Sequence, residues 1–357
     1  MFRLIYIAIL LLCNAAFVRA QEARPFKVGI ILALSGEGMF FGQSLKNGML
    51  LAYESLSKED QQAMQLIFED DSMVSRNTIT AFNKLRSVDD IDAVVTMTSG
   101  TSNALAPLAE RQKIPMIAIA SDKTVCANRN YVMNHWATPE VEAEVAVQEA
   151  ERRNYKKIIA LTTLHDGGLA VKNSFKIAAK NKIELVIEED IAYDNRDIRS
   201  IIAKIKTKKD VDAIMLALLP GQLAVLAKQL RQYGVSLPLF GFEMFEDKEE
   251  VKASDGALIN QWYVNASDAT GEYTKKYISR YGDNATRIAS NNGFDIIMII
   301  NDALKKERSR QFVNRYFHTL KDYRGASGVY SATDDNRFSL PAAVKLVTDK
   351  EFIQLRQ

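Results

Sequence analysis

Short apolar runs alternate with amphipathic stretches along most of this chain. The apolar runs are continuous rather than alternating, which is typical of strands that are covered on both faces. They predict strands at 27–34, 65–69, 93–98, 115–120, 157–163, 184–190, 213–217 and 237–240. Stretches with helical periodicity predict helices at 43–56, 75–88, 102–112, 139–153, 168–180, 197–206 and 221–233. The regular alternation of strands and helices indicates α/β architecture, with mostly parallel sheets and helices on both faces.

This alternation occurs twice, which predicts two α/β units. The first set of strands ends near Ala120, and the second set begins at Pro139 and closes near Tyr263. The remaining chain predicts helices at 270–281, 288–305 and 310–320. It ends in a predicted hairpin formed by strands at 339–347 and 351–355. A chain of 357 residues also exceeds what a single compact core usually holds.

The first 20 residues have the pattern of a cleavable export signal. Arg3 precedes an apolar run at 4–12, and the small residues around Ala20 form a cleavage site. The run is too short to span a bilayer as a helix. Cys13 follows Leu12, where a lipoprotein signal requires a small residue, so lipid anchoring is disfavoured. We therefore expect a periplasmic protein, remote from cytosolic ATP and NAD.

Charge and cysteine content narrow the choice of partners. Loss of residues 1–20 removes Arg3 and Arg19 from the 46 basic residues, which then balance the 44 acidic ones. A neutral chain lacks the basic face that nucleic acid or an anionic membrane requires, so neither is expected as a partner. Cys126 is then the only cysteine, so stability has to come from packed cores rather than from an internal disulfide.

Two segments carry a resemblance to a known family. They are KVGIILALSGEGMFFGQSLKNGMLLA at 27–52 and VVTMTSGTSNALAPLAERQKIPMIAIAS at 94–121. Both resemble the leucine/isoleucine/valine-binding proteins, which are type I periplasmic solute-binding proteins of ABC importers. The likeness continues through LRQYGVSLPLFGFEMF to GVYSATDDNRFSLPAAVKL and covers nearly the whole mature chain. The order and spacing of these segments carry the resemblance, since no single motif is diagnostic.

The resemblance implies a Venus-flytrap fold of two doubly wound parallel-sheet domains joined by three crossovers. It places one lobe at 25–136 plus 266–329 and the other at 139–261 plus 332–357. The implied function is capture of an amino acid or related small solute by hinge closure, with delivery to an ABC permease in the inner membrane. The resemblance implies a monomer that is not an enzyme and needs no cofactor or metal.

The implied site begins in the first lobe. Ser99 and Gly100 follow a strand and precede a helix, where backbone N–H groups and the helix dipole attract an anion. The resemblance assigns the ligand carboxylate to this position, while simple helix capping by Ser102 is the alternative. Phe41 matches an apolar ligand contact, with a hydrophobic staple as its alternative.

The next loop departs from the family pattern. Ala120 is implied to contact the ligand through its backbone. Asp122 stands where the family has a threonine that holds the carboxylate, and an acid would repel that group. Either Thr124 takes this role or the ligand is not a plain amino acid, and an ordinary solvated turn at Asp122 is equally open.

Acidic residues mark the second lobe. Glu243 matches the acid that pairs with the ligand ammonium, although an acidic surface run follows it. Asp166 lies after a strand on the same side of the cleft, near the usual place of a tyrosine. Asp122, Asp166 and Glu243 together indicate a positively charged or multiply hydrogen-bonding solute, while branched-chain amino acids are the family default.

Two other functions stay open. Gly36, Gly38 and Gly42 imitate a dinucleotide fingerprint, but their spacing is wrong and the acids Glu69 and Asp70 follow too late. An exported nucleotide-dependent enzyme is therefore disfavoured. A sensory or accessory binding protein would use the same fold. Trp136 and Trp262 fall on the implied crossovers, where packing at the hinge is expected of them rather than ligand contact.

Overall fold

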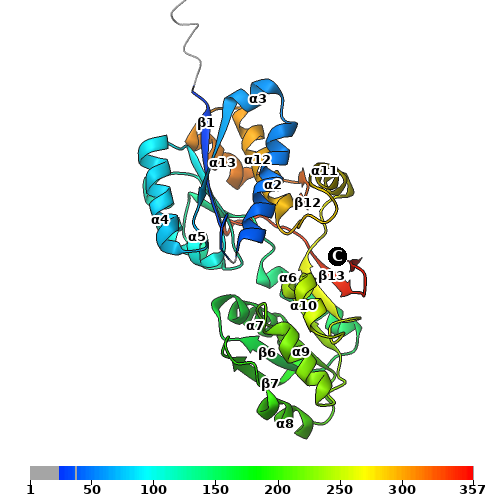
Figure 1. The fold of residues 1–357 in the computed structure, drawn as a ribbon. Coiled ribbons are helices and arrows are strands. Elements are labelled where there is room, and N and C mark those ends of the chain that lie inside the picture. Colours follow the sequence, from blue (N-terminus) through cyan, green and yellow to red (C-terminus); the bar gives the residue numbers. More distant parts are fainter. Residues whose placement is uncertain (1–23, 37, 357) are drawn as a thin grey trace, which may run out of the picture.

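The computed structural model describes residues 24–36 and 38–356. The predicted export signal lies outside the described residues. Within them, two α/β lobes are stacked end to end (Figure 1). Each lobe is built on its own sheet, as the repeated strand–helix pattern predicted.

The first lobe contains a five-stranded parallel sheet with strand order β2-β1-β3-β4-β5. Its strands are β1 (Phe26–Leu32), β2 (Met64–Asp70), β3 (Ala93–Met97), β4 (Met116–Ile119) and β5 (Val132–Asn134). The four strands expected before Ala120 are thereby confirmed. The order reverses between β1 and β3, and ligands of such sheets bind beyond the carboxyl ends of the strands at this switch point.

Helices cover both faces of this sheet, which explains its continuous apolar strands. One face carries α2 (Met39–Ser55), α12 (Ser290–Leu304) and α13 (Arg310–Thr319), and the other carries α4 (Ser75–Lys84) and α5 (Ser99–Gln112) (Figure 1). Further elements complete the lobe: α3 (Lys58–Ala63), η1 (Leu85–Asp89), η2 (Lys123–Val125), α11 (Gly271–Tyr281), β11 (Tyr323–Gly325) and β12 (Gly328–Tyr330).

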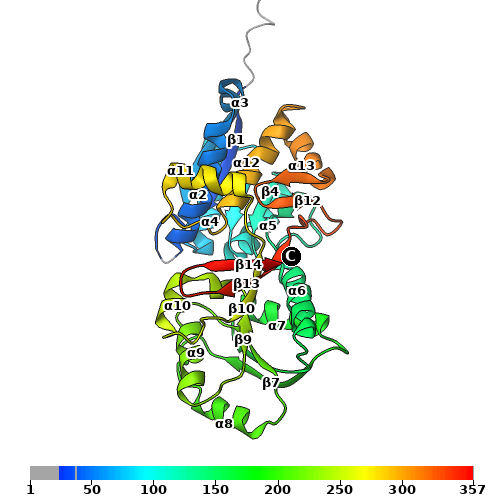
Figure 2. The same cartoon turned by 90° about the vertical axis from the view of Figure 1, so that its right-hand side faces the viewer.

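The second lobe contains a seven-stranded sheet with strand order β14-β13-β10-β9-β8-β6-β7. Five strands are parallel, namely β6 (Lys157–Thr163), β7 (Glu184–Ile191), β8 (Ala213–Ala217), β9 (Leu239–Gly241) and β10 (Trp262–Ala266). The predicted terminal hairpin is confirmed as β13 (Ala342–Val347) and β14 (Phe352–Arg356), which pair antiparallel. Figure 2 shows this hairpin at the level where the lobes meet.

Helices also sandwich the second sheet. One face carries α6 (Pro139–Arg152) and α7 (Asp166–Ala178), and the other carries α8 (Arg199–Thr207), α9 (Leu223–Gln232) and α10 (Lys248–Ala253). A 3-10 turn, η3 (Glu243–Glu246), follows β9. The amino end of α6 directly follows the crossover from the first lobe.

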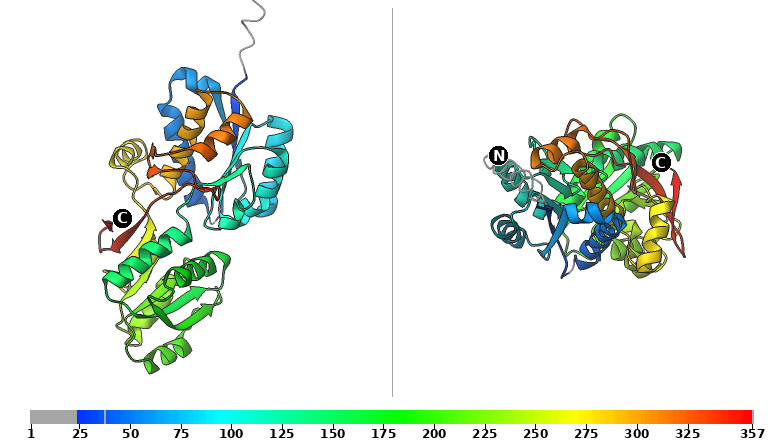
Figure 3. Two further views of the ribbon diagram at one scale, coloured as in Figure 1. Left: turned by 180° about the vertical axis from the view of Figure 1, so that it is seen from behind. Right: turned by 90° about the horizontal axis from the view of Figure 1, so that it is seen from above.

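The chain passes between the sheets three times. It leaves the first sheet after β5 and returns after β10, and it then runs from β12 to β13 through residues 331–341. The final strand ends beside the junction of the lobes (Figure 3). β10 pairs with β9 and β13, so the segment 262–266 hydrogen-bonds within the second sheet. The lobe boundaries given above stay a prediction.

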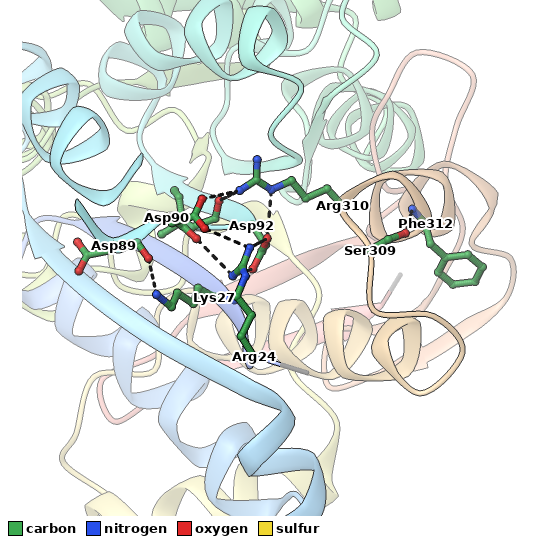
Figure 4. Close-up of polar contacts among 9 residues, drawn as sticks. Arg24, Lys27, Asp89, Asp90, Asp92, Ser309, Arg310 and Phe312 are labelled. Atoms are coloured by element: carbon green, nitrogen blue, oxygen red, sulfur yellow. Dashed lines mark hydrogen bonds and ion pairs between the residues drawn. The ribbon is translucent and has the colours of Figure 1, made fainter. Parts of the chain in front are cut away.

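An ion cluster at the far end of the first lobe ties its pieces together (Figure 4). Asp92 is 6% exposed and accepts hydrogen bonds from Arg24 at 2.8 Å and from Arg310 at 3.1 Å. Arg24 precedes β1, while Arg310 begins α13, so one carboxylate joins segments that are more than 200 residues apart in sequence. This cluster lies at the amino end of the sheet, remote from the lobe junction.

Candidate functional site

The two lobes face each other across a cavity of about 390 Å³. The first lobe contributes Phe41, Met73, 98–100, 119–121 and Trp136, and the second contributes Pro139, Glu142, His165, Gly167, Gly168, Val171, 216–219 and 242–244. Most of these residues come directly after a strand or begin a helix. The cavity therefore lies beyond the carboxyl ends of the parallel strands of both sheets, where open α/β sheets bind ligands.

One wall is the amino end of α5. Ser99 is the first residue of this helix and borders the cavity with Gly100. Thr98, at the cap position, has φ 65° and ψ 152°, and no side chain caps the helix. A non-glycine residue in this backbone region is strained, a condition that is common at binding sites. The N–H groups of the first turn have no intrahelical acceptor, so they are available to an anion.

The helix-capping alternative for Ser102 is wrong. Ser102 lies within the first turn of α5 instead of before it, and its buried hydroxyl shares a hydrogen bond of 2.8 Å with that of Thr96. Ser99 Oγ accepts a hydrogen bond of 3.1 Å from the backbone N–H of Asp122. Since that bond uses the oxygen as acceptor, the hydroxyl proton of Ser99 remains available for donation.

The Asp122 loop is held by bonds of its own. The carboxylate accepts hydrogen bonds from the N–H of Thr124 at 2.8 Å, from the Thr124 hydroxyl at 2.7 Å and from Asn103 at 2.6 Å. Burial opposes ionisation of Asp122, but the bonds from Thr124 and Asn103 outweigh it and lower the pKa of this carboxyl. The cavity wall includes neighbouring Ser121, whereas Asp122 and Thr124 border a separate, smaller pocket.

Ala120 borders the cavity, but its backbone is already engaged. Its N–H donates to Asn134 Oδ1 at 3.1 Å, and its carbonyl accepts from Asn134 Nδ2 at 2.7 Å. A ligand can use only the second lone pair of that carbonyl. Asn134 is fully buried at the end of β5 and was missed by sequence reasoning, because a lone asparagine in a short apolar run gives no signal.

Two aromatic side chains form another part of the wall. Phe41 lies in the first turn of α2, and its ring meets the ring of Trp136 edge-on at 6.0 Å. Trp136 borders the cavity, so the expectation that it only packs at the hinge is incomplete. Trp262, in contrast, stacks on Phe240 at 4.4 Å within the second lobe.

Two glutamates form the acidic part of the second lobe's wall. Glu243 begins η3, and Glu142 lies near the start of α6. Burial, with the negative charge of Glu246, raises the pKa of Glu243 to about 7. Burial, with the charge of Glu243, raises the pKa of Glu142 well above its usual range. Sequence reasoning found Glu243 and missed Glu142.

Basic side chains near these glutamates are engaged elsewhere. The described part of the cavity wall contains no lysine or arginine. The positive charge of Lys345 acts to lower the pKa of Glu142, but Lys345 itself pairs with Glu246 at 3.0 Å and with Asp268 at 2.7 Å. The acidic wall therefore offers two carboxyl groups that no basic side chain of the described wall pairs with.

The remaining second-lobe wall is mainly apolar. Leu218 and Leu219 follow β8, as the sequence indicated. His165 borders the cavity and caps α7, with its Nδ1 accepting from the N–H of Gly167 at 3.2 Å. Asp166 is the first residue of α7, and its side chain lies outside the described part of the structure.

The resemblance to a dinucleotide fingerprint has another explanation. A Cβ at Gly42 would come 1.9 Å from the carbonyl oxygen of Ala33, so this glycine lets α2 approach the end of β1. Asp70 accepts a hydrogen bond of 2.8 Å from the N–H of Leu34 and holds the same loop. Among residues 24–36 and 38–356, there is no group of three or more His, Cys, Asp or Glu that could hold a metal ion.

Comparison with known proteins identifies the family. A family profile described as "Periplasmic binding protein" matches residues 25–350. The chain belongs to this family. Its fold is the type I periplasmic binding protein fold, and the resemblance found in the sequence is confirmed. Members bind solutes for ABC transporters and are not known as catalysts, which fits a binding protein better than an enzyme.

Individual relatives show the range of solutes. A Leu/Ile/Val-binding protein, BraC3 of Rhizobium johnstonii, is 24% identical over 73% of this chain and 72% of its own. The branched-chain amino acid binding protein LivJ of Streptococcus pneumoniae, solved with isoleucine, has a TM-score of 0.79 at 19% identity, covering 94% of this chain and all of its own. A solute-binding protein from R. palustris, solved with benzoate, has a TM-score of 0.78 at 16% identity, and the match covers 93% of this chain and 96% of that protein.

In the described part of this periplasmic binding protein, none of the helices combines the length and the apolar character that crossing a bilayer requires. The family assignment gives the fold and the solute-binding role.

Proposed function

We propose that this protein captures an amino acid or a related ammonium-bearing solute in the periplasm and delivers it to an ABC permease. In this proposal the first lobe holds the solute and the second closes over it through the three crossovers. The observation that carries the proposal is the pairing of an uncapped helix amino end with an acidic wall across one cavity. A zwitterion matches these two charges.

The carboxylate end is assigned to Ser99 and the first turn of α5. Exposed N–H groups and a free hydroxyl proton support this assignment. The ammonium end is assigned to Glu243, which borders the cavity with no basic side chain beside it in the described wall. Phe41 and the leucines at 218 and 219 provide apolar surface for the rest of the solute.

Binding is tested by thermal shift and calorimetry with a panel of amino acids, amines and aromatic acids. An amino acid should raise the Tm of the wild-type protein, because a ligand that binds only the folded state stabilises it. Ser99→Ala should weaken that binding about tenfold, the usual effect of losing one hydrogen bond to a charged group. Ser87→Ala makes the same change at an exposed position and should leave affinity unaltered.

The mechanism and the partner need separate readouts. Because Trp136 borders the cavity at the crossover from β5 to α6, ligand should change its fluorescence as the lobes close. Deleting the gene should abolish uptake of the solute that binds. Normal uptake with a lost sensory response would instead support the accessory-receptor alternative, and chemical conversion of the solute would refute the proposal.

A further inference from the structure

Glu142 is the least expected ionisable group in the cavity wall. Glu142 is only 5% exposed. Its carboxylate oxygen Oε1 is buried without a hydrogen-bond partner among the described residues. It nevertheless borders the cavity. Burying a carboxylate without a partner is costly, and proteins retain such groups where something else supplies the missing partner.

The other acids of α6 make the contrast clear. Glu140 pairs with Lys123 and with Arg337, each at 3.1 Å, although the Glu140 side chain is much more exposed than Glu142. Glu149, which is buried like Glu142, is held by Arg152 and Arg153 at 2.8 and 2.7 Å. Within the described chain, Glu142 therefore stands out as the buried acid of this helix that no arginine or lysine pairs with at salt-bridge distance.

Charge balance across the cavity extends this observation. The amino end of α5 offers roughly half a positive charge to a carboxylate, whereas the opposite wall carries two carboxyl groups, Glu142 and Glu243. A neutral amino acid brings one ammonium, which would satisfy Glu243 and leave Glu142 without a partner. A second cationic group on the solute would complete the pairing.

We propose that Glu142 is a second recognition carboxylate and that the solute carries two cationic groups, as a dibasic amino acid does. This inference rests on the proposed function and deepens it, because it specifies the charge of the captured solute. Glu243 takes the α-ammonium in this arrangement, and Glu142 takes the side-chain cation. The apolar wall between the lobes contacts the methylene groups that separate the two cations.

Matched pairs of ligands test this assignment directly. Lysine and norleucine share the same four side-chain carbons, and only lysine carries a terminal ammonium, while arginine and citrulline differ in the charge of the terminal group. Calorimetry should show that wild-type protein binds each cationic member at least tenfold more tightly than its neutral partner, a difference of about 1.4 kcal/mol. The measurement is made at about pH 8, where the ligand cations stay charged.

Glu142→Gln should remove this preference while changing norleucine affinity less than about threefold, since glutamine keeps the shape and loses the charge. Glu144→Gln removes the same charge from an exposed position on the same helix and should keep the preference. Because both variants are measured by binding, a correctly folded Glu142→Gln protein is recognised by its retained affinity for norleucine.

Three outcomes overturn the inference. If wild-type protein binds norleucine as tightly as lysine, or if Glu142→Gln keeps the preference for lysine, Glu142 is not a recognition group, while the proposed function stands. If the wild-type protein binds none of the four amino acids and none of the wider amino-acid panel, the proposed function fails and the inference fails with it.

Discussion

The unusual ionisation of Glu243 allows a quantitative test of the acidic wall in the ligand-free protein. Burial raises the pKa of this carboxyl from 4.5 to about 7 in the folded state. Each unit of difference between folded and unfolded pKa corresponds to about 1.4 kcal/mol, so the shift amounts to about 3 kcal/mol. Glu243 borders the cavity and keeps some solvent contact, which makes this figure an upper value.

The sign follows from proton uptake. Between about pH 4.5 and about pH 7 the folded protein holds the Glu243 proton, whereas the unfolded chain has released it. The free energy of unfolding must therefore fall as pH rises through this window, and it levels off above it. Glu243→Gln cannot titrate, so its stability should not include this loss.

The assay is urea unfolding of wild type and Glu243→Gln at about pH 5 and about pH 8. The variant should gain up to about 3 kcal/mol relative to wild type between the two pH values. Glu144→Gln, on the exposed side of α6, should show no such gain. A variant that tracks wild type at both pH values would refute the idea that Glu243 is a desolvated carboxyl.

Glu142 extends the test, because the charge of Glu243 contributes to raising its pKa. Removing that charge should ease ionisation of Glu142, so the two groups titrate as a coupled pair. A double-mutant cycle with Glu142→Gln should then give non-additive effects at about pH 8 and additive effects at about pH 5. Additive effects at both pH values would show that the two carboxyl groups do not interact.

Two further perturbations test how the first lobe is held together. A Cβ at Gly48 would come 1.8 Å from the carbonyl oxygen of Ser290, so Gly48→Ala should cost at least about 2 kcal/mol in urea unfolding. Gly100→Ala, whose added Cβ meets nothing within 4 Å, should leave stability unchanged or raise it by up to about 1 kcal/mol, because alanine is the better helix former. Asp92→Asn weakens the contacts to Arg24 and Arg310 and should cost about 2 kcal/mol, with unchanged stability counting against a structural role for that cluster.

Local pattern determined much of the fold before any contact was known. Continuous apolar runs identified the parallel strands β1 to β4 and β6 to β9, and the repeated alternation with helices predicted two sheets covered on both faces. The same reasoning placed candidate ligand contacts after strands, and Ser99, Gly100 and Glu243 do border the cavity. These features depend on neighbours in sequence, so they can be read without tertiary information.

Tertiary structure decided which polar groups face the cavity. Asp122 looked equivalent to Glu243 in sequence, yet bonds from Thr124 and Asn103 hold it in its own loop. In the sequence, Glu142 is one of several acids near the start of a predicted helix. Only the packing of α6 decides that Glu142, and not the neighbouring acids, borders the cavity. Sequence gives the residue types and the order of the elements, but the direction of a side chain is set by packing between segments far apart in the chain.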